Sequence, residues 1–342
     1  MSSVTKTMAN HKRTIIGIGS VITFVLLYPQ FATAGQLFFA NTVVIAIIFA
    51  TSTNLLFGQA GIPSFGQAGF FGAGAYATAI SSHAGLPVLV NIGIGILVGA
   101  IVGAIAAMIA WRASGLAFSM LTLAFAQSLY TLAIRTEFLG GYNGLAGFRF
   151  NEVLGISLAD PGFVWFFVSG FAALILLAFW QISRSSFGLV LRAVRDDPIR
   201  VLFLGIDVRA YRTLAFILAA AGAGAAGSMA AYVNQVVTPN SLFWTASALP
   251  VMMLVLGGMR TFIGPAVGAL VFLTLQHYLS AWTPSYILYM GILFYVVLRT
   301  LPEGIVSIPS LIKSSRANKN SQKNAGRDGL DGARADERAV QL

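Results

Sequence analysis

The sequence predicts an all-α protein that crosses a lipid bilayer about ten times. Of its 342 residues, 57% are hydrophobic and only 9% are charged, whereas a soluble globular chain carries about 25% charged residues. The apolar residues gather in uncharged stretches, and a helix needs about 20 such residues to cross the hydrocarbon core. The lysines and arginines lie between alternate stretches, as expected for a membrane protein with positive inner loops.

Ten stretches meet the length requirement, taken in chain order. The third and the eighth are short, which is typical of broken or re-entrant helices, so the number of spans is uncertain by about two. The predicted spans are 14–34, 36–56, 65–82, 88–111, 115–134, 162–182, 213–235, 243–259, 264–282 and 286–301.

The positive charges predict that both ends of the chain lie in the cytoplasm. With ten spans, 19 of the 21 lysines and arginines fall on the inner side. The exceptions, Arg135 and Arg149, lie in an outer loop that also holds Glu137, Glu152 and Asp160. The net charge of +10 is therefore explained by membrane topology, and no nucleic-acid partner is expected.

The sequence divides into three regions. Residues 1–13 form a short cytoplasmic segment, 14–312 the transmembrane domain, and 313–342 a polar tail expected to be disordered. A cleavable signal peptide is an alternative for the N-terminus, because a basic segment and an apolar run precede Ala32-Thr33-Ala34. The second span follows almost at once, which favours a retained helical hairpin.

Missing residue types exclude several activities. Without cysteine there can be no disulfide or thiolate metal site. ATP hydrolysis by this chain is also excluded, because a phosphate-binding loop needs a Gly-Lys pair and the lysines lie only near the two termini. The GxGxxG pattern of Gly222, Gly224 and Gly227 lies inside a predicted span, which indicates helix packing. No cofactor, metal or catalytic group is expected.

Acidic residues and lysines are absent from the middle of every predicted span. Proton-coupled carriers use buried ionisable groups as relays, so this chain either draws energy from another subunit or needs none. His277 lies near the end of a span, where a neutral, hydrogen-bonded ring is the simpler interpretation.

The inner loop 183–212 predicts two short helices. Phe187, Val190, Leu191 and Val194 share one face at helical spacing. Asp197 then fits a helix N-cap, Pro198 the first helical residue and Gly205 the terminator. The second helix is too apolar for a loop in water, so it requires either the membrane interface or the groove of a partner protein.

The segment 54–76, NLLFGQAGIPSFGQAGFFGAGAY, is rich in glycine and interrupted by Pro63. An interrupted helix in a transporter exposes backbone groups to the transport pathway, and Gln59, Gly61, Ser64 and Gln67 are the candidates to line it. Close helix packing by the glycines is the alternative explanation.

Three segments resemble the permease family of bacterial branched-chain amino acid ABC importers. The glycine-rich stretch of that family is similar to residues 54–76, its long cytoplasmic loop to FGLVLRAVRDDPIRVLFLGIDVRAYRTLAF, and a late glycine motif to VLGGMRTFIGPAVGA. The similarity runs from about residue 41 to residue 304. It implies the fold of an ABC importer permease in the bacterial inner membrane.

The resemblance also implies partners and a coupling site. Such a permease pairs with a second homologous permease or with its own copy, and works with two cytoplasmic ABC ATPase subunits and an extracytoplasmic substrate-binding protein. The ATPase-coupling residues would be Arg192, Ala193, Asp196, Asp197, Pro198 and Gly205.

Two positions depart from the family pattern. Many members carry paired alanines where this chain has Arg200-Val201-Leu202-Phe203, and relatives often have histidine in place of Gln67.

The expected substrate is leucine, isoleucine or valine. Importers for urea, short amides or aromatic acids have similar permeases and are alternatives. A second alternative is a stand-alone facilitator or exchanger of small neutral solutes, which would transport without an ATPase.

Overall fold

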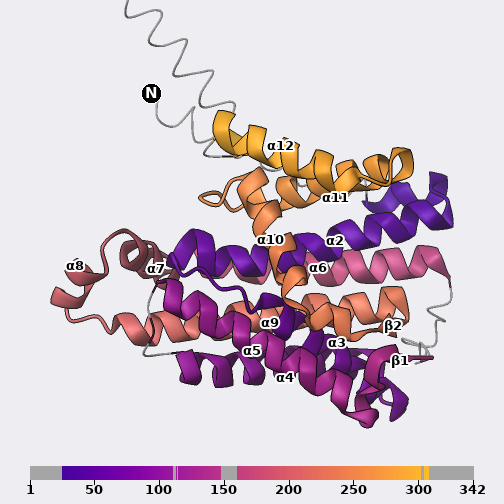
Figure 1. Ribbon diagram of the computed structural model, residues 1–342, viewed down its shortest axis with the longest axis horizontal. Helices are drawn as coiled ribbons and strands as arrows, with labels where there is room; N and C mark the ends of the chain where they lie inside the picture. Colours follow the sequence, from indigo (N-terminus) through magenta and orange to yellow (C-terminus); the bar gives the residue numbers. More distant parts are fainter. Residues whose placement is uncertain (1–24, 111–112, 114, 148–159, 302–303, 308–342) are drawn as a thin grey trace, which may run out of the picture.

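The computed structural model describes residues 25–110, 113, 115–147, 160–301 and 304–307. Long helices run roughly side by side through this part of the chain (Figure 1). At one end of the bundle lie two short helices, α7 (Ser186–Asp196) and α8 (Pro198–Phe203). At the other end, β1 (Leu145–Ala146) pairs antiparallel with β2 (Val236–Val237).

Nine of the ten predicted spans coincide with helices, which confirms the all-α membrane fold. The first, 14–34, lies mostly outside the described residues, of which 25–31 are helical. The nine helices are α2 (Ala34–Asn54), α3 (Gln67–His83), α4 (Val88–Ala110), α5 (Leu116–Arg135), α6 (Pro161–Arg184), α9 (Val208–Asn234), α10 (Trp244–Gly257), α11 (Gly264–Trp282) and α12 (Tyr286–Thr300). Five described helices are long and apolar enough to cross a membrane alone.

Small residues allow α3, α4 and α9 to form the centre of the bundle. The glycines of the GxGxxG pattern lie within α9, where Gly224 faces Gly74 of α3 and Gly99 of α4 at backbone contact. Any side chain at these crossings would push the helices apart. The interpretation of this pattern as helix packing is therefore confirmed.

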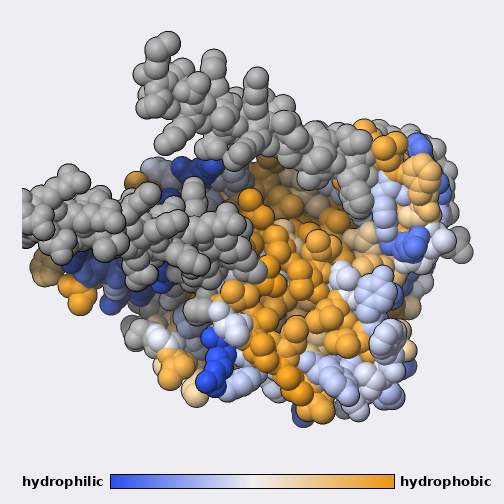
Figure 2. All heavy atoms as spheres, turned by 90° about the horizontal axis from the view of Figure 1, so that it is seen from above, coloured by the Kyte–Doolittle hydropathy of each residue, from blue (hydrophilic) through white to orange (hydrophobic). Residues whose placement is uncertain are grey.

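Apolar side chains also cover the outside of the bundle. Figure 2 shows a broad hydrophobic surface across the middle of one face, with polar residues toward both ends. Exposed residues such as Leu97, Ile101, Leu174 and Leu177 lie on the outer sides of α4 and α6. This inverted arrangement, with small residues inside and large apolar residues outside, suits a lipid environment.

The packing of α9 against α3 is open to a direct test. A Cβ atom at Gly227 would collide with the backbone carbonyl of Phe71, so Gly227→Ala should cost about 1–3 kcal/mol of stability. Thermal unfolding of the detergent-solubilised protein would measure the loss. Gly93→Ala is the matched control, because a Cβ there meets nothing within 4 Å. Equal unfolding temperatures for the two variants would contradict the packing.

Candidate functional site

The long inner loop folds as the sequence predicts, with α7 held against the bundle. Ser185 caps the helix by accepting a hydrogen bond from the Gly188 backbone amide. Leu191 and Val194 are fully buried, and the ring of Phe187 stacks on that of Tyr211 in α9. One face of α7 is thus fixed to the base of the neighbouring helices.

Both predicted ends of α8 are confirmed. The side chain of Asp197 accepts a hydrogen bond from the Arg200 backbone amide at 3.0 Å, and Pro198 is the first helical residue. Asp197 also forms an ion pair with the Arg200 side chain at 3.2 Å. The turn that ends the helix contains Gly205 with φ +78°, a backbone conformation that glycine adopts without strain.

The outer surface of α8 and of the turn after it is hydrophobic. Val201 is buried beneath the helix, whereas Ile199, Leu202, Phe203 and Leu204 have exposed fractions of 67%, 61%, 86% and 73%. Four large apolar side chains on a structure of this size form a patch of the kind that binds a partner or a membrane surface. We call these four residues the α8 patch.

The remaining predicted coupling residues lie at the end of α7. Arg192 donates a hydrogen bond to the Ser183 carbonyl at 2.8 Å, while Ala193 and Asp196 are exposed. Arg195 points back into the protein and donates to the carbonyl oxygen of Gly58 at 2.5 Å. This contact of Arg195 could not be predicted from the sequence, because its partner lies 137 residues away.

The partner of Arg195 belongs to the glycine-rich segment, where the helix breaks as predicted. After Asn54, α2 continues as a π-helix over Leu55–Ala60 and ends at Gly61, whose φ is +67°. Residues 61–66 then cross to the start of α3 without helical structure. Arg195 packs directly on Gly61, since a Cβ there would lie 2.6 Å from its Cγ atom.

Neighbouring helices bind the backbone of this break. Ser119 of α5 donates to the Pro63 carbonyl at 2.9 Å, and Thr122 accepts from the Phe65 amide at 3.2 Å. Ser247 of α10 accepts from the Ala68 amide at 2.9 Å, in the first turn of α3. The first turns of α3 and α10 therefore meet inside the protein.

The four predicted pathway residues take different positions around the break. Gly61 is exposed, whereas Ser64 and Gln67 are fully buried. The amide of Gln59 donates to the Ser183 hydroxyl at 2.9 Å, which links the break to the end of α6. The Gln59 side-chain oxygen has no hydrogen-bond partner among the described residues, and for Gln67 this is true of both amide atoms.

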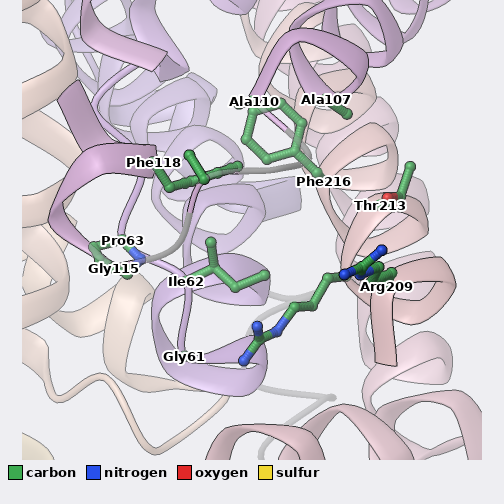
Figure 3. Close-up of a pocket in the computed structure, with 12 residues that line it drawn as sticks. Gly61, Ile62, Pro63, Ala107, Ala110, Gly115, Phe118, Arg209, Thr213 and Phe216 are labelled. Carbon is green, nitrogen blue, oxygen red and sulfur yellow. The ribbon is translucent and has the colours of Figure 1, made fainter. Parts of the chain in front are cut away.

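A cavity of about 360 Å³ lies beside the break, between α4, α5 and α9. Figure 3 shows Phe118, Phe216 and Ala110 toward one end of the cavity, and Gly61 with Arg209 toward the other. Arg212 also lines it. In the sequence both arginines are recognisable only as loop charges, because a single sequence does not show which helix ends enclose a cavity.

Comparison with known proteins identifies the family. The family model described as "Branched-chain amino acid transport system / permease component" matches residues 35–300. The chain belongs to this family. This permease is therefore a transport component and not an enzyme, and its family places it among ABC transporter subunits.

Two relatives illustrate the similarity. The permease is 24% identical to the high-affinity branched-chain amino acid transport system permease protein LivM of Escherichia coli K12, over 89% of this chain and 78% of the relative. It is also 24% identical to the probable branched-chain amino acid transport permease protein LivH of Methanocaldococcus jannaschii, over 80% of this chain and 91% of the relative. No solved structure matches the permease.

The turn after α8 provides a test of the loop. Replacing Gly205 by valine places a β-branched residue at φ +78°, which costs roughly 1–3 kcal/mol and should displace the α8 patch. We expect transport by the assembled system to fall at least about tenfold, while the amount of permease in the membrane is unchanged. Gly205→Asn should retain most transport, because asparagine tolerates this conformation. Normal transport by the valine variant would show that the turn is dispensable.

Proposed function

We propose that this permease forms the membrane path of an ATP-driven importer for branched-chain amino acids. Membership of the family supports this proposal, as do the names of its relatives. The absence of acidic residues and lysines from the predicted span centres fits a path for a zwitterionic or neutral solute. Importers of urea, short amides or aromatic acids remain the alternative within the same class.

We propose that the permease lies in the bacterial inner membrane, with α7, α8 and both chain ends in the cytoplasm. Arg184, Arg192, Arg195, Arg200 and Arg209 all fall at the end of the molecule that carries α7 and α8. Cytoplasmic loops retain such positive charge, which supports this orientation.

The α8 patch is the observation that carries the proposal. We assign it to a groove on a cytoplasmic ABC ATPase subunit, with Phe203 and Leu204 as the most exposed contacts. Full burial of one such side chain contributes about 1.5–3 kcal/mol. A second permease and an extracytoplasmic binding protein would complete the importer.

Arg195 would transmit movement of the ATPase to the membrane path. Its side chain joins α7 to the Gly58 carbonyl and rests on Gly61. Gly58 in turn packs against the backbone of Met259, and Asn54 donates to the Thr261 carbonyl at 3.3 Å. A displacement of α7 therefore reaches both the break after α2 and the turn between α10 and α11.

The role of the α8 patch predicts loss of ATPase binding when it becomes polar. In the double variant Phe203→Ser and Leu204→Ser, the ATPase subunits should no longer copurify with the permease, because the apolar contact area is removed. Tyr142→Ser is the control, since Tyr142 is also 81% exposed but lies in the segment leading to β1 at the opposite end. Unchanged copurification in the double variant would rule out this docking surface.

The role of Arg195 predicts a different defect. Arg195→Gln should leave the ATPase subunits bound and hydrolysing ATP, but should reduce solute uptake at least about tenfold, because the link to Gly58 is lost. Arg200→Gln is the control, as its side chain pairs only locally with Asp197. Uptake and ATP hydrolysis would be measured together in proteoliposomes. A proportional fall in both activities would argue against a transmitting role.

Reconstitution of the complete system tests the proposed function itself. Leucine uptake into proteoliposomes should require ATP, the ATPase subunits and the binding protein. Uptake by the purified permease alone, without nucleotide, would instead support a stand-alone facilitator or exchanger.

A further inference from the structure

The starting point is a buried arginine nitrogen atom without a hydrogen-bond partner among the described residues. Arg212 of α9 has its Nε atom buried, and no residue in the described part of the chain accepts a hydrogen bond from it. Neither the Arg195–Asp196 nor the Arg200–Asp197 ion pair involves Arg212. Arg212 is half-buried, and partial removal of a guanidinium group from water is costly unless a counter-charge compensates it, so an anion from outside the protein would stabilise this position.

Arg212 lies at the boundary between the hydrocarbon core and the lipid headgroups. The 27 residues of α9 measure about 40 Å at 1.5 Å per residue, whereas the hydrocarbon core is about 30 Å thick. Roughly 5 Å of helix, about one turn, therefore extends beyond the core at each end. Arg209 and Arg212 lie in the first turns of α9, at the end where α4 stops and α5 begins.

The space around Arg212 combines positive charge with apolar walls. On one side is the cavity of about 360 Å³, whose deeper part is formed by Ala107, Phe118 and Phe216 (Figure 3). On the other side, a groove of about 940 Å³ between α8 and α9 is lined by Leu214 and Ile217 of α9 and by Ile199 and Leu202 of α8. Phe203 and Leu204, the most exposed contacts of the α8 patch, do not line it. Arg209 and Arg212 line both spaces.

One acidic residue borders the groove. Asp207 lies just before α9, and its carboxylate accepts hydrogen bonds from the backbone amides of Arg209 and Ala210 at 2.9 and 3.2 Å. This carboxylate serves as the cap of α9 and forms no ion pair with Arg212. Asp207 therefore does not compensate the charge of Arg212.

From these observations we infer that the groove at the start of α9 binds an anionic phospholipid. The phosphodiester group lies beside Arg212 and Arg209, and the acyl chains follow the apolar side chains toward the membrane centre, along Leu214 and Ile217. Basic pockets between helices at the membrane surface recognise anionic headgroups in this way. The exposed side chain of Leu214 and the half-buried Ile217 favour a lipid over a small soluble anion, which would leave them in water.

The inference is tested on the purified full-length chain in neutral detergent. Native mass spectrometry would measure binding of dioleoylphosphatidylglycerol and dioleoylphosphatidylcholine, and we expect the anionic lipid to bind more tightly. Because one arginine near a membrane surface contributes about fivefold in affinity, Arg212→Gln should weaken phosphatidylglycerol binding about fivefold. Arg209→Gln combined with Arg212→Gln should weaken it about 25-fold. Arg212→Lys should remain within about twofold of the natural sequence.

Two further variants serve as a control for specificity and as a second probe of the site. Arg299→Gln removes an arginine from the end of α12, outside the groove, and should leave lipid binding unchanged. Thr213→Glu introduces a carboxylate into both spaces and should weaken phosphatidylglycerol binding even if Arg212→Gln does not fold.

Three results would overturn the inference. The first is equal binding of the two lipids, or unchanged phosphatidylglycerol binding in Arg212→Gln and Thr213→Glu. The second is an equal loss in Arg299→Gln, which would indicate unspecific attraction to the positive surface. The third is displacement of the lipid by excess inorganic phosphate, which would assign the site to a free anion.

Discussion

Within a bilayer every backbone amide and carbonyl must find a partner inside the protein, and this requirement determines how the helix break is built. Lipid supplies no hydrogen bonds, so irregular backbone is tolerated only where protein surrounds it. Residues 61–66 satisfy the condition by using side chains from other helices, notably Ser119 and Thr122 of α5. Arg195 adds a bond to Gly58 just before the break. Hydrogen bonds to the break and to Gly58 just before it therefore fix the positions of α5 and α7 relative to the end of α2.

The same requirement brings the two glycine-rich turns together. Gly58 has no room for a side chain because the carbonyl of Met259 lies against it, and Asn54 reaches the Thr261 carbonyl across the same contact. Ser247 joins the first turns of α3 and α10 on the other side of the break. Two interrupted regions, far apart in the sequence, thus form one unit. Displacement of this unit would move the four helices joined to it, α2, α3, α10 and α11.

Much of this arrangement could be predicted from the sequence, because it depends on local chemistry. The lengths of the apolar stretches predicted the membrane spans. Asp197, Pro198 and Gly205 predicted both ends of α8 to within one residue. The contact of Arg195 with Gly58 could not be predicted, since its geometry exists only after helices distant in sequence have packed. The same holds for Gln67. Its burial in a predicted pathway segment and its two unpaired amide atoms follow from the meeting of α3 and α10.

The arginines of the inner loop look alike in the sequence, yet the structure gives each a different partner. Arg200 pairs with the cap residue Asp197, and Arg195 binds a backbone carbonyl in the neighbouring break. Arg212 has no acceptor for its buried Nε atom in the described part of the chain. The total positive charge of a loop can set its orientation relative to the membrane. The interaction that each arginine makes depends on its burial and on the hydrogen-bond acceptors near it. For the Nε atom of Arg212, at the edge of the hydrocarbon core, an anionic lipid headgroup is the partner that we infer.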